Sequence, residues 1–177
     1  MCAICDLKID FNIDHPHALT VAVATREAID AGQLPATVFD GPFANANLRL
    51  AAIDALKALQ QRLEASMPAS ELMALPDFYV LLIEVGTWGY FHANEQGFDP
   101  DCSPEPPDVT AANVEDRDVV FISTETALQA ILDHRIGLDS AFERNLLMLD
   151  AGAGDAARLR RVLEMSVQFG AAVPEES

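Results

Sequence analysis

The sequence predicts an α+β protein in which a mostly antiparallel sheet is covered by helices on one face. Two observations predict this class: strand-like segments gather in the middle of the chain, and no regular alternation of strands and helices surrounds them. The composition is globular, since 50% of the 177 residues are hydrophobic and 22% are charged. The length favours one compact domain with a short N-terminal appendage. We expect an extension over 1–43, a domain over 44–170 and a flexible tail over 171–177.

The N-terminal extension is predicted to contain a strand and a helix. Residues 7–13 alternate between apolar and polar side chains, which is the pattern of a half-buried strand. Pro16 suits the first turn of a helix and Gly32 suits its end, so a helix is predicted over roughly 16–31. Two prolines and two glycines between residues 32 and 47 indicate a connector.

Prolines and the spacing of apolar residues define the next elements. Apolar side chains recur at three- and four-residue steps and predict a helix over 47–65, which ends before Pro68. A brief helical turn is expected over 70–75. The apolar run 78–85 predicts a buried strand, and the alternating aromatic residues of 87–93 predict a hairpin or meander with it.

The second half of the chain begins with an acidic segment. Residues 97–118 contain four prolines and seven acidic residues, which predicts a solvated loop. The apolar segment 118–123 predicts a strand, and either Ser123 or Thr124 can cap the amphipathic helix that follows. The remaining expected elements are a helical turn over 138–143, an apolar strand over 146–149 and a final helix capped by Asp155.

A series of motifs over residues 118–163 carries a resemblance to a known family. A strand ending in serine, a helix with the sequence LQAIL, a Leu-Asp-x-Ala-Phe segment, an apolar strand, Gly-Asp and a leucine-rich helix follow one another. This order resembles the sterol-carrier-protein-like lipid-binding family, and a less specific fit extends over about 47–168. The matching residues are Ser123, Leu128, Ile131, Leu132, Leu138, Asp139, Ala141, Phe142, Leu147, Leu149, Gly154, Asp155, Leu159 and Leu163.

The resemblance implies a non-enzymatic protein that binds a sterol, a fatty acyl chain or a similar lipid in an apolar cavity between sheet and helices. The chain departs from the family at Asn145, where a hinge glycine is usual, and in the acidic insert 97–118. Methionine and aromatic side chains suit an adaptable pocket, although such residues also form ordinary cores. The predicted ligand-binding residues are Phe78, Val80, Leu82, Trp88, Tyr90, Phe91, Ile131, Phe142, Met148 and Met165.

The N-terminus suggests a second function, a metal-binding protein of the zinc type. Cys2 and Cys5 form a CxxC motif, and His15 and His17 follow it. Two thiolates and two imidazoles are ligands that Zn²⁺ prefers, although this spacing is not a standard one. The alternatives are thiol chemistry, either as a redox pair or with Cys2 as an N-terminal nucleophile, and two ordinary cysteines near a chain end.

Glu84 interrupts the apolar run that predicts the first buried strand. A carboxyl that faced the interior would have a raised pKa and could orient a polar head group of a ligand. The alternative is a carboxylate that faces water. The sequence contains no phosphate-binding loop, no dinucleotide-binding glycine motif and no HExxH motif, which favours a binding protein over an enzyme.

The charge of the chain narrows the class of partner. Its 11 basic and 28 acidic residues give a net charge of −17, which disfavours nucleic acids and anionic membranes. We expect a hydrophobic small molecule as ligand, with a second copy of the chain or a basic protein as further partners. The three cysteines do not form a disulfide framework, and the chain shows neither a secretory signal nor a membrane-spanning run. These features predict a cytoplasmic protein.

Overall fold

The computed structural model describes residues 14–36, 41–84, 86–99, 101–102 and 104–170. The predicted strand over 7–13, the pair Cys2 and Cys5, and the tail over 171–177 lie outside these residues. The described elements are α1 (Ala18–Asp30), α2 (Ala44–Ser66), α3 (Ala69–Leu72), β1 (Phe78–Leu82), β2 (Thr87–Phe91), β3 (Ala93–Asn94), β4 (Gly97–Phe98), the 3₁₀ turn η1 (Val114–Asp116), β5 (Val120–Ser123), α4 (Glu125–Leu132), α5 (Leu138–Glu143), β6 (Leu147–Asp150) and α6 (Ala153–Gly170).

The molecule is an α+β protein, as predicted, built on a four-stranded sheet with the order β2-β1-β5-β6. The two outer pairings are antiparallel, and the central pairing of β1 with β5 is parallel. Strand β2 runs back along β1, so that its last residue, Phe91, lies opposite Phe78, the first residue of β1. Strand β5 starts beside the start of β1, with Tyr79 opposite Val120 and Leu82 opposite Ser123.

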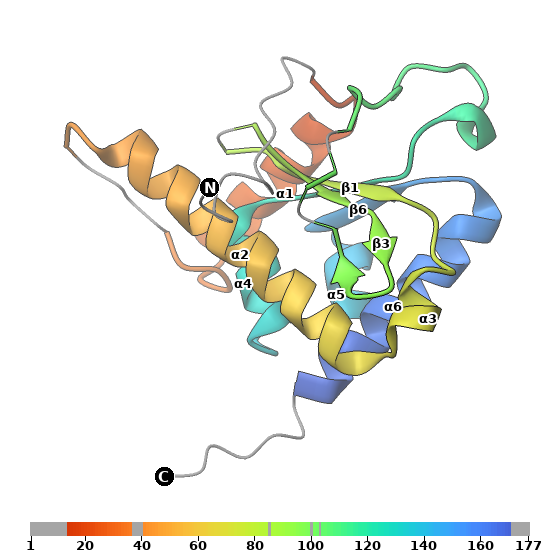
Figure 1. Ribbon diagram of the computed structural model, residues 1–177. Coiled ribbons are helices and arrows are strands. Elements are labelled where there is room, and N and C mark those ends of the chain that lie inside the picture. The colour runs from red at the N-terminus through yellow and green to blue at the C-terminus, as the bar shows by residue number, and fades with distance from the viewer. Residues whose placement is uncertain (1–13, 37–40, 85, 100, 103, 171–177) are drawn as a thin grey trace, which may run out of the picture.

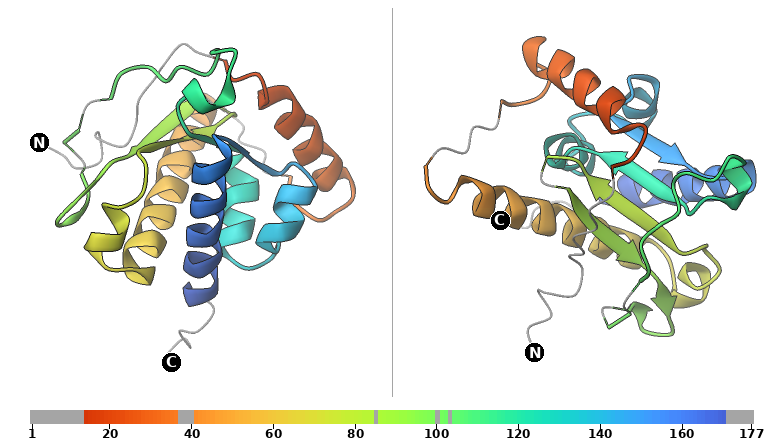
Figure 2. Two further views of the ribbon diagram at one scale, coloured as in Figure 1. Left: turned by 90° about the vertical axis from the view of Figure 1, so that its right-hand side faces the viewer. Right: turned by 90° about the horizontal axis from the view of Figure 1, so that it is seen from above.

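The two faces of the sheet are covered by different helices. On one face, Phe78, Val80 and Leu82 join a core cluster with residues of α2, α4 and α6, and these three helices lie side by side beneath the sheet (Figure 1; Figure 2, left). On the other face, Tyr79 and Leu81 form a second cluster with Val21 of α1, although Ala28 at the far end of this helix belongs to the first cluster. The predicted placement of all helices on one face is therefore wrong for α1. Both faces of β1 are apolar, so both need cover.

Local signals account for the boundary between β5 and α4. The Thr124 hydroxyl accepts a hydrogen bond from the backbone N–H of Ala127 (3.2 Å) and caps α4, whereas the Ser123 hydroxyl donates to the carbonyl of Leu146 (2.8 Å).

The turn between α5 and β6 contains Asn145, where the predicted family usually has a glycine. Asn145 has a φ of 56°, a left-handed conformation that asparagine adopts more readily than most residues.

The start of α6 differs from the prediction. The helix begins at Ala153, two residues before the predicted cap Asp155, and the side chain of Glu115 accepts a hydrogen bond from the backbone N–H of Ala153 (3.0 Å). No helix in the described part of the chain combines the length and the hydropathy of a membrane span.

Candidate functional site

The structure separates the predicted ligand-binding residues into different groups. Phe78, Val80, Leu82, Phe91 and Ile131 belong to the first core cluster, against which Phe142 packs. Trp88 belongs to the second cluster on the other face of the sheet, and Tyr90 and Met148 pack against it. Met165 is exposed. Alternation along a strand sends neighbouring side chains to opposite faces, so these residues do not line one cavity.

The interior between the sheet and α2, α4 and α6 is largely filled by its own side chains. The rings of Phe78 and Phe91 stack with their centroids 4.7 Å apart, and Phe121 meets Phe78 edge-on at 5.7 Å. The cavity that adjoins Val80, Phe121 and Ile131 holds about 20 Å³. Ligand pockets commonly measure about 300–1,000 Å³, so this cavity has room for water but not for an acyl chain.

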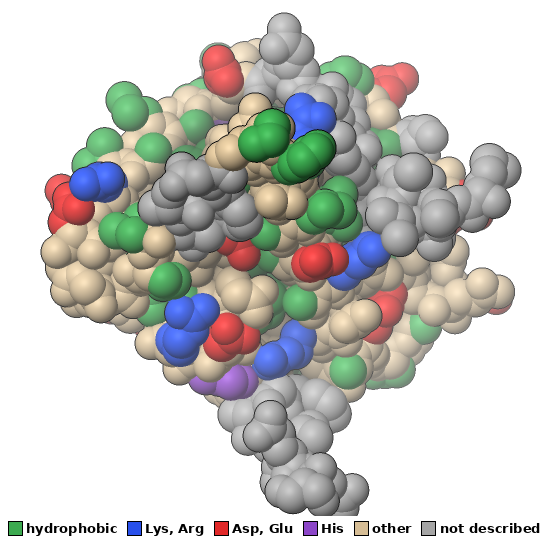
Figure 3. All heavy atoms as spheres, turned by 90° about the vertical axis from the view of Figure 1, so that its left-hand side faces the viewer, with side chains coloured by type: hydrophobic (Ala, Val, Ile, Leu, Met, Phe, Trp, Pro, Cys, Tyr) green, Lys and Arg blue, Asp and Glu red, His purple; other side chains and the backbone are tan. Residues whose placement is uncertain are grey.

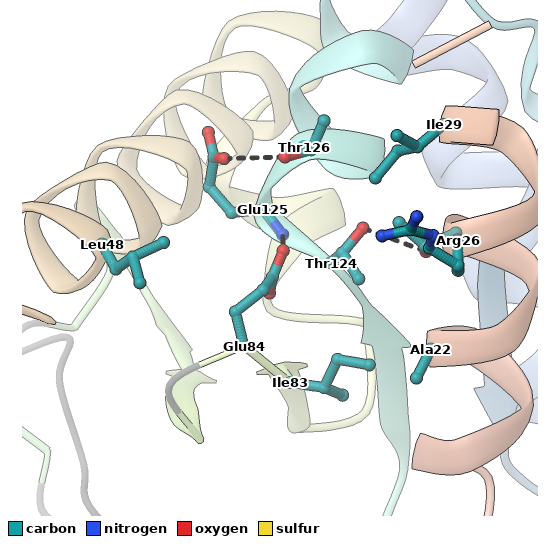
Figure 4. Close-up of a pocket in the computed structure, with 10 residues that line it drawn as sticks. Ala22, Arg26, Ile29, Leu48, Ile83, Glu84, Thr124, Glu125 and Thr126 are labelled. Atoms are coloured by element: carbon teal, nitrogen blue, oxygen red, sulfur yellow. Dashed lines mark hydrogen bonds between the residues drawn. The ribbon is translucent and has the colours of Figure 1, made fainter. Parts of the chain in front are cut away.

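A pocket of about 350 Å³ lies instead at the edge of the sheet where β1 and β5 end (Figure 4). Its walls come from α1, α2, the segment after β1 and the start of α4. The lining residues are Ala22, Thr25, Arg26, Ile29, Leu48, Ile83, Glu84, Thr124, Glu125 and Thr126.

The parallel pairing of β1 with β5 creates this pocket. Because the two strands run the same way, their carboxyl ends lie at one edge, where open α/β sheets commonly bind ligands. The backbone N–H of Ile83 donates to the carbonyl of Ser123 (3.1 Å), which extends the pairing to the pocket floor. Helix α1 is held to this edge through a hydrogen bond between the buried hydroxyls of Thr25 and Thr124 (3.3 Å).

Glu84 occupies the centre of the pocket, between Leu48 and the α1 side chains (Figure 4). Its carboxylate accepts a hydrogen bond from the backbone N–H of Glu125 (2.7 Å), at the start of α4. Desolvation by the surrounding protein raises the pKa of Glu84 to about 7, and the charge of Glu125 adds to the rise, although backbone hydrogen bonds oppose it. The residue as a whole remains exposed to solvent.

The pocket combines apolar walls with a few polar groups. Ala22, Ile29, Leu48 and Ile83 supply the apolar surface. Arg26 lines the pocket but pairs with Asp30 (3.0 Å), and both of these side chains are exposed. Such an arrangement suits a ligand with an apolar body and one polar group that hydrogen-bonds near Glu84.

The structure places the predicted metal ligands His15 and His17 beside each other, with their rings 5.4 Å apart. His15 is buried; its Nδ1 accepts a hydrogen bond from the backbone N–H of His17 (3.1 Å), and its Nε2 lies 3.3 Å from Oδ2 of Asp150. Desolvation lowers the pKa of His15 to about 4, against the opposing charge of Asp150. A zinc ion at His15 would have to displace one of these partners.

Within the described ranges, no group of three or more His, Cys, Asp or Glu side chains is arranged to hold a metal ion. Because Cys2 and Cys5 lie outside those ranges, the zinc site stays a prediction.

Sequence reasoning identified Glu84 but missed the rest of the pocket. One signal was available: Ala22, Thr25, Arg26 and Ile29 recur at three- and four-residue steps, so they share one face of α1. That face combines apolar Ala22 and Ile29 with polar Thr25 and Arg26, so it gives only a weak hydrophobic periodicity.

Comparison of the chain with protein-family models, with curated proteins and with solved structures finds no match. The resemblance of residues 118–163 to the sterol-carrier-like family therefore stays a prediction.

Proposed function

We propose that the protein is a non-enzymatic binding protein for a small, largely apolar ligand. The observation that supports this function is the pocket of about 350 Å³ between α1, α2 and the carboxyl ends of β1 and β5. Its volume is at the lower end of the range for ligand pockets, which favours a compact ligand over a sterol or a long acyl chain. The proposed site thus differs from the cavity between sheet and helices that the family resemblance implies.

The chemistry of the lining favours binding over catalysis. Among the residues that the structure describes, those that line the pocket include neither histidine nor cysteine. The hydroxyl of Thr124 is committed to the cap of α4 and to Thr25. The Glu84 carboxylate holds the start of α4. These two groups therefore shape the pocket and can orient a ligand, and they do not form a pair of nucleophile and adjacent base.

The surface charge bears on the choice of partner. On the face shown in Figure 3, acidic and basic side chains lie close together among hydrophobic ones. A basic protein would meet no continuous acidic surface on that face, although the net charge is −17.

A blocked pocket tests the proposal. Ala22→Trp places an indole in the pocket, whereas Val23→Trp, at an exposed neighbouring position on α1, serves as the matched control. The probe is the neutral compound 3-phenyl-1-propanol, followed by amide chemical shifts in NMR titrations. We expect saturable shifts at Glu84 and Thr124–Thr126 in the parent protein and in the control, and their loss in Ala22→Trp.

Two results would overturn the proposal. One is the absence of saturable shifts in a parent protein that is folded by circular dichroism. The other is a set of shifts centred on Phe121 and Ile131, which would place the ligand between sheet and helices, as the family resemblance implies.

A further inference from the structure

A second hollow adjoins the proposed ligand pocket. It measures about 450 Å³ and is lined by Asn45, Ala46 and Arg49 of α2 together with Glu84. Glu84 lines both hollows. Leu48, which faces the apolar pocket, lies three residues after Asn45 and next to Arg49, so this face of α2 borders both spaces. The two hollows therefore differ in chemistry and share one carboxylate.

We propose that the two hollows form one site for an α-amino acid with a bulky apolar side chain. This inference rests on the proposed function and specifies its ligand class. The side chain lies among Ala22, Ile29, Leu48 and Ile83, the ammonium group hydrogen-bonds Glu84, and the carboxylate binds Arg49 and the amide of Asn45.

The surroundings of Glu84 suit an ammonium partner. One carboxylate offers about four lone-pair positions, so the hydrogen bond from the Glu125 N–H leaves room for another donor. Glu125 also lines the pocket and adds a second negative charge nearby. Desolvation disfavours the ionised carboxylate, and an ammonium at hydrogen-bond distance restores it, which couples binding to the charge of Glu84.

The second hollow suits a carboxylate. A guanidinium group binds a carboxylate with two parallel hydrogen bonds, and Arg49 is half-buried, which limits the screening of that contact. Helix α2 begins at Ala44, its N-cap residue Phe43 provides no side-chain cap, and its first turn carries no acidic residue. The positive end of this helix therefore adds to the attraction exerted by Arg49.

A matched series of four small molecules tests the assignment. Phenylalanine carries all three groups; 2-phenylethylamine lacks the carboxylate, 3-phenylpropanoate lacks the ammonium and alanine lacks the ring. We expect phenylalanine to bind at least about tenfold more tightly than each of the other three, because each removes one charge-assisted contact or the apolar body. The measurement is the dissociation constant from NMR titration at pH 7.5.

Variants assign the two charged ends. Arg49→Gln is expected to remove the advantage of phenylalanine over 2-phenylethylamine, and Glu84→Gln its advantage over 3-phenylpropanoate. The glutamine oxygen can still accept from the Glu125 N–H, so α4 keeps its partner. Arg158→Gln and Glu71→Gln, at exposed positions outside both hollows, are controls that keep the preference.

The result that overturns the inference differs from failure of the proposed function. If 3-phenyl-1-propanol binds the pocket while phenylalanine binds no more tightly than its two truncated analogues, the inference is wrong and the apolar pocket stands. The inference is also wrong if Arg49→Gln leaves the preference for phenylalanine over 2-phenylethylamine unchanged. If neither the neutral probe nor phenylalanine binds, both proposals fail.

Discussion

The closed interior and the edge pocket are built from the same sheet, yet the spaces that they leave differ widely in volume. Beneath the sheet, the side chains of α2, α4 and α6 meet Phe78, Val80 and Leu82 and leave a cavity of about 20 Å³. Where β1 and β5 end, three helices approach the strand ends without closing over them, and about 350 Å³ stays open. Apolar residues in a strand therefore indicate packing, whereas a site arises where elements converge and their side chains do not interdigitate.

The largest expected effect comes from opening the closed interior. Phe78→Ala removes a fully buried ring that stacks on Phe91 and meets Phe98 and Phe121 edge-on. We expect the free energy of unfolding to fall by about 3–5 kcal/mol, since the loss of buried surface adds to the cost of a cavity. Urea denaturation measures this change.

The same variant sharpens the comparison. If ligand binding belongs to the edge pocket, Phe78→Ala leaves the dissociation constant of 3-phenyl-1-propanol there within about twofold, in conditions where the variant is folded. A loss of binding that exceeds the loss of folded protein would instead connect the interior to the ligand site.

The second expected effect concerns His15, which lies just before α1 and contacts Asp150 of β6. Helix α1 forms one wall of the edge pocket. The pKa of His15 is about 4 in the folded protein, below its ordinary value of 6.5. Between pH 6.5 and pH 4, the unfolded chain therefore carries a proton on this imidazole that the folded protein does not. The contribution of His15 to the free energy of unfolding is complete above pH 6.5 and is lost as the pH falls toward 4. One pKa unit corresponds to about 1.4 kcal/mol, so the loss approaches about 3 kcal/mol.

Measurement of this effect requires a reference without the imidazole. His15→Gln is expected to show a flatter dependence of the free energy of unfolding on pH between 6.5 and 4 than the parent protein. Arg117 and Asp150 remain in place in both proteins, so the difference reports the buried imidazole. Parallel pH profiles for the two proteins would contradict the assignment.

The smallest expected effect comes from the contact that joins α1 to the strand edge. Thr25→Val keeps the shape of the side chain but removes its hydrogen bond to Thr124. We expect a loss of about 1 kcal/mol in the free energy of unfolding and a few-fold weaker binding of 3-phenyl-1-propanol, because the α1 wall is less firmly held. Thr20→Val on the same helix, at an exposed position, is the control. Equal effects of the two substitutions would show that this hydrogen bond does not position the wall.

Much of the fold was predictable because its signals are local. Pro16 and Gly32 predicted α1, and the spacing of apolar residues predicted α2, to within a few residues, and Pro68 marks the end of α2. Thr124, one of two predicted caps, does cap α4. Asp155 was wrong as the cap of α6, since Glu115 fills that role from 38 residues away. A side chain remote in sequence leaves no local signal at the helix that it caps.

The candidate site was predictable in one residue only. Glu84 stood out because a carboxyl in an apolar run is unusual, and its pKa is raised as expected for a partly desolvated group. The ten predicted ligand-binding residues share large size and apolarity. Core residues have the same properties, and most of the ten are core residues in the structure.

By itself, the sequence determined the α+β class and the approximate positions of helices and strands, because periodicity, proline and capping act over a few residues. Only the tertiary structure decided that β5 lies parallel to β1, that α1 covers the second face, and that Glu84 meets the start of α4. These contacts join residues far apart in the chain, and their energies depend on which surfaces remain uncovered once the sheet has formed. The pocket exists because these long-range contacts bring α1, α2 and the start of α4 to the ends of β1 and β5.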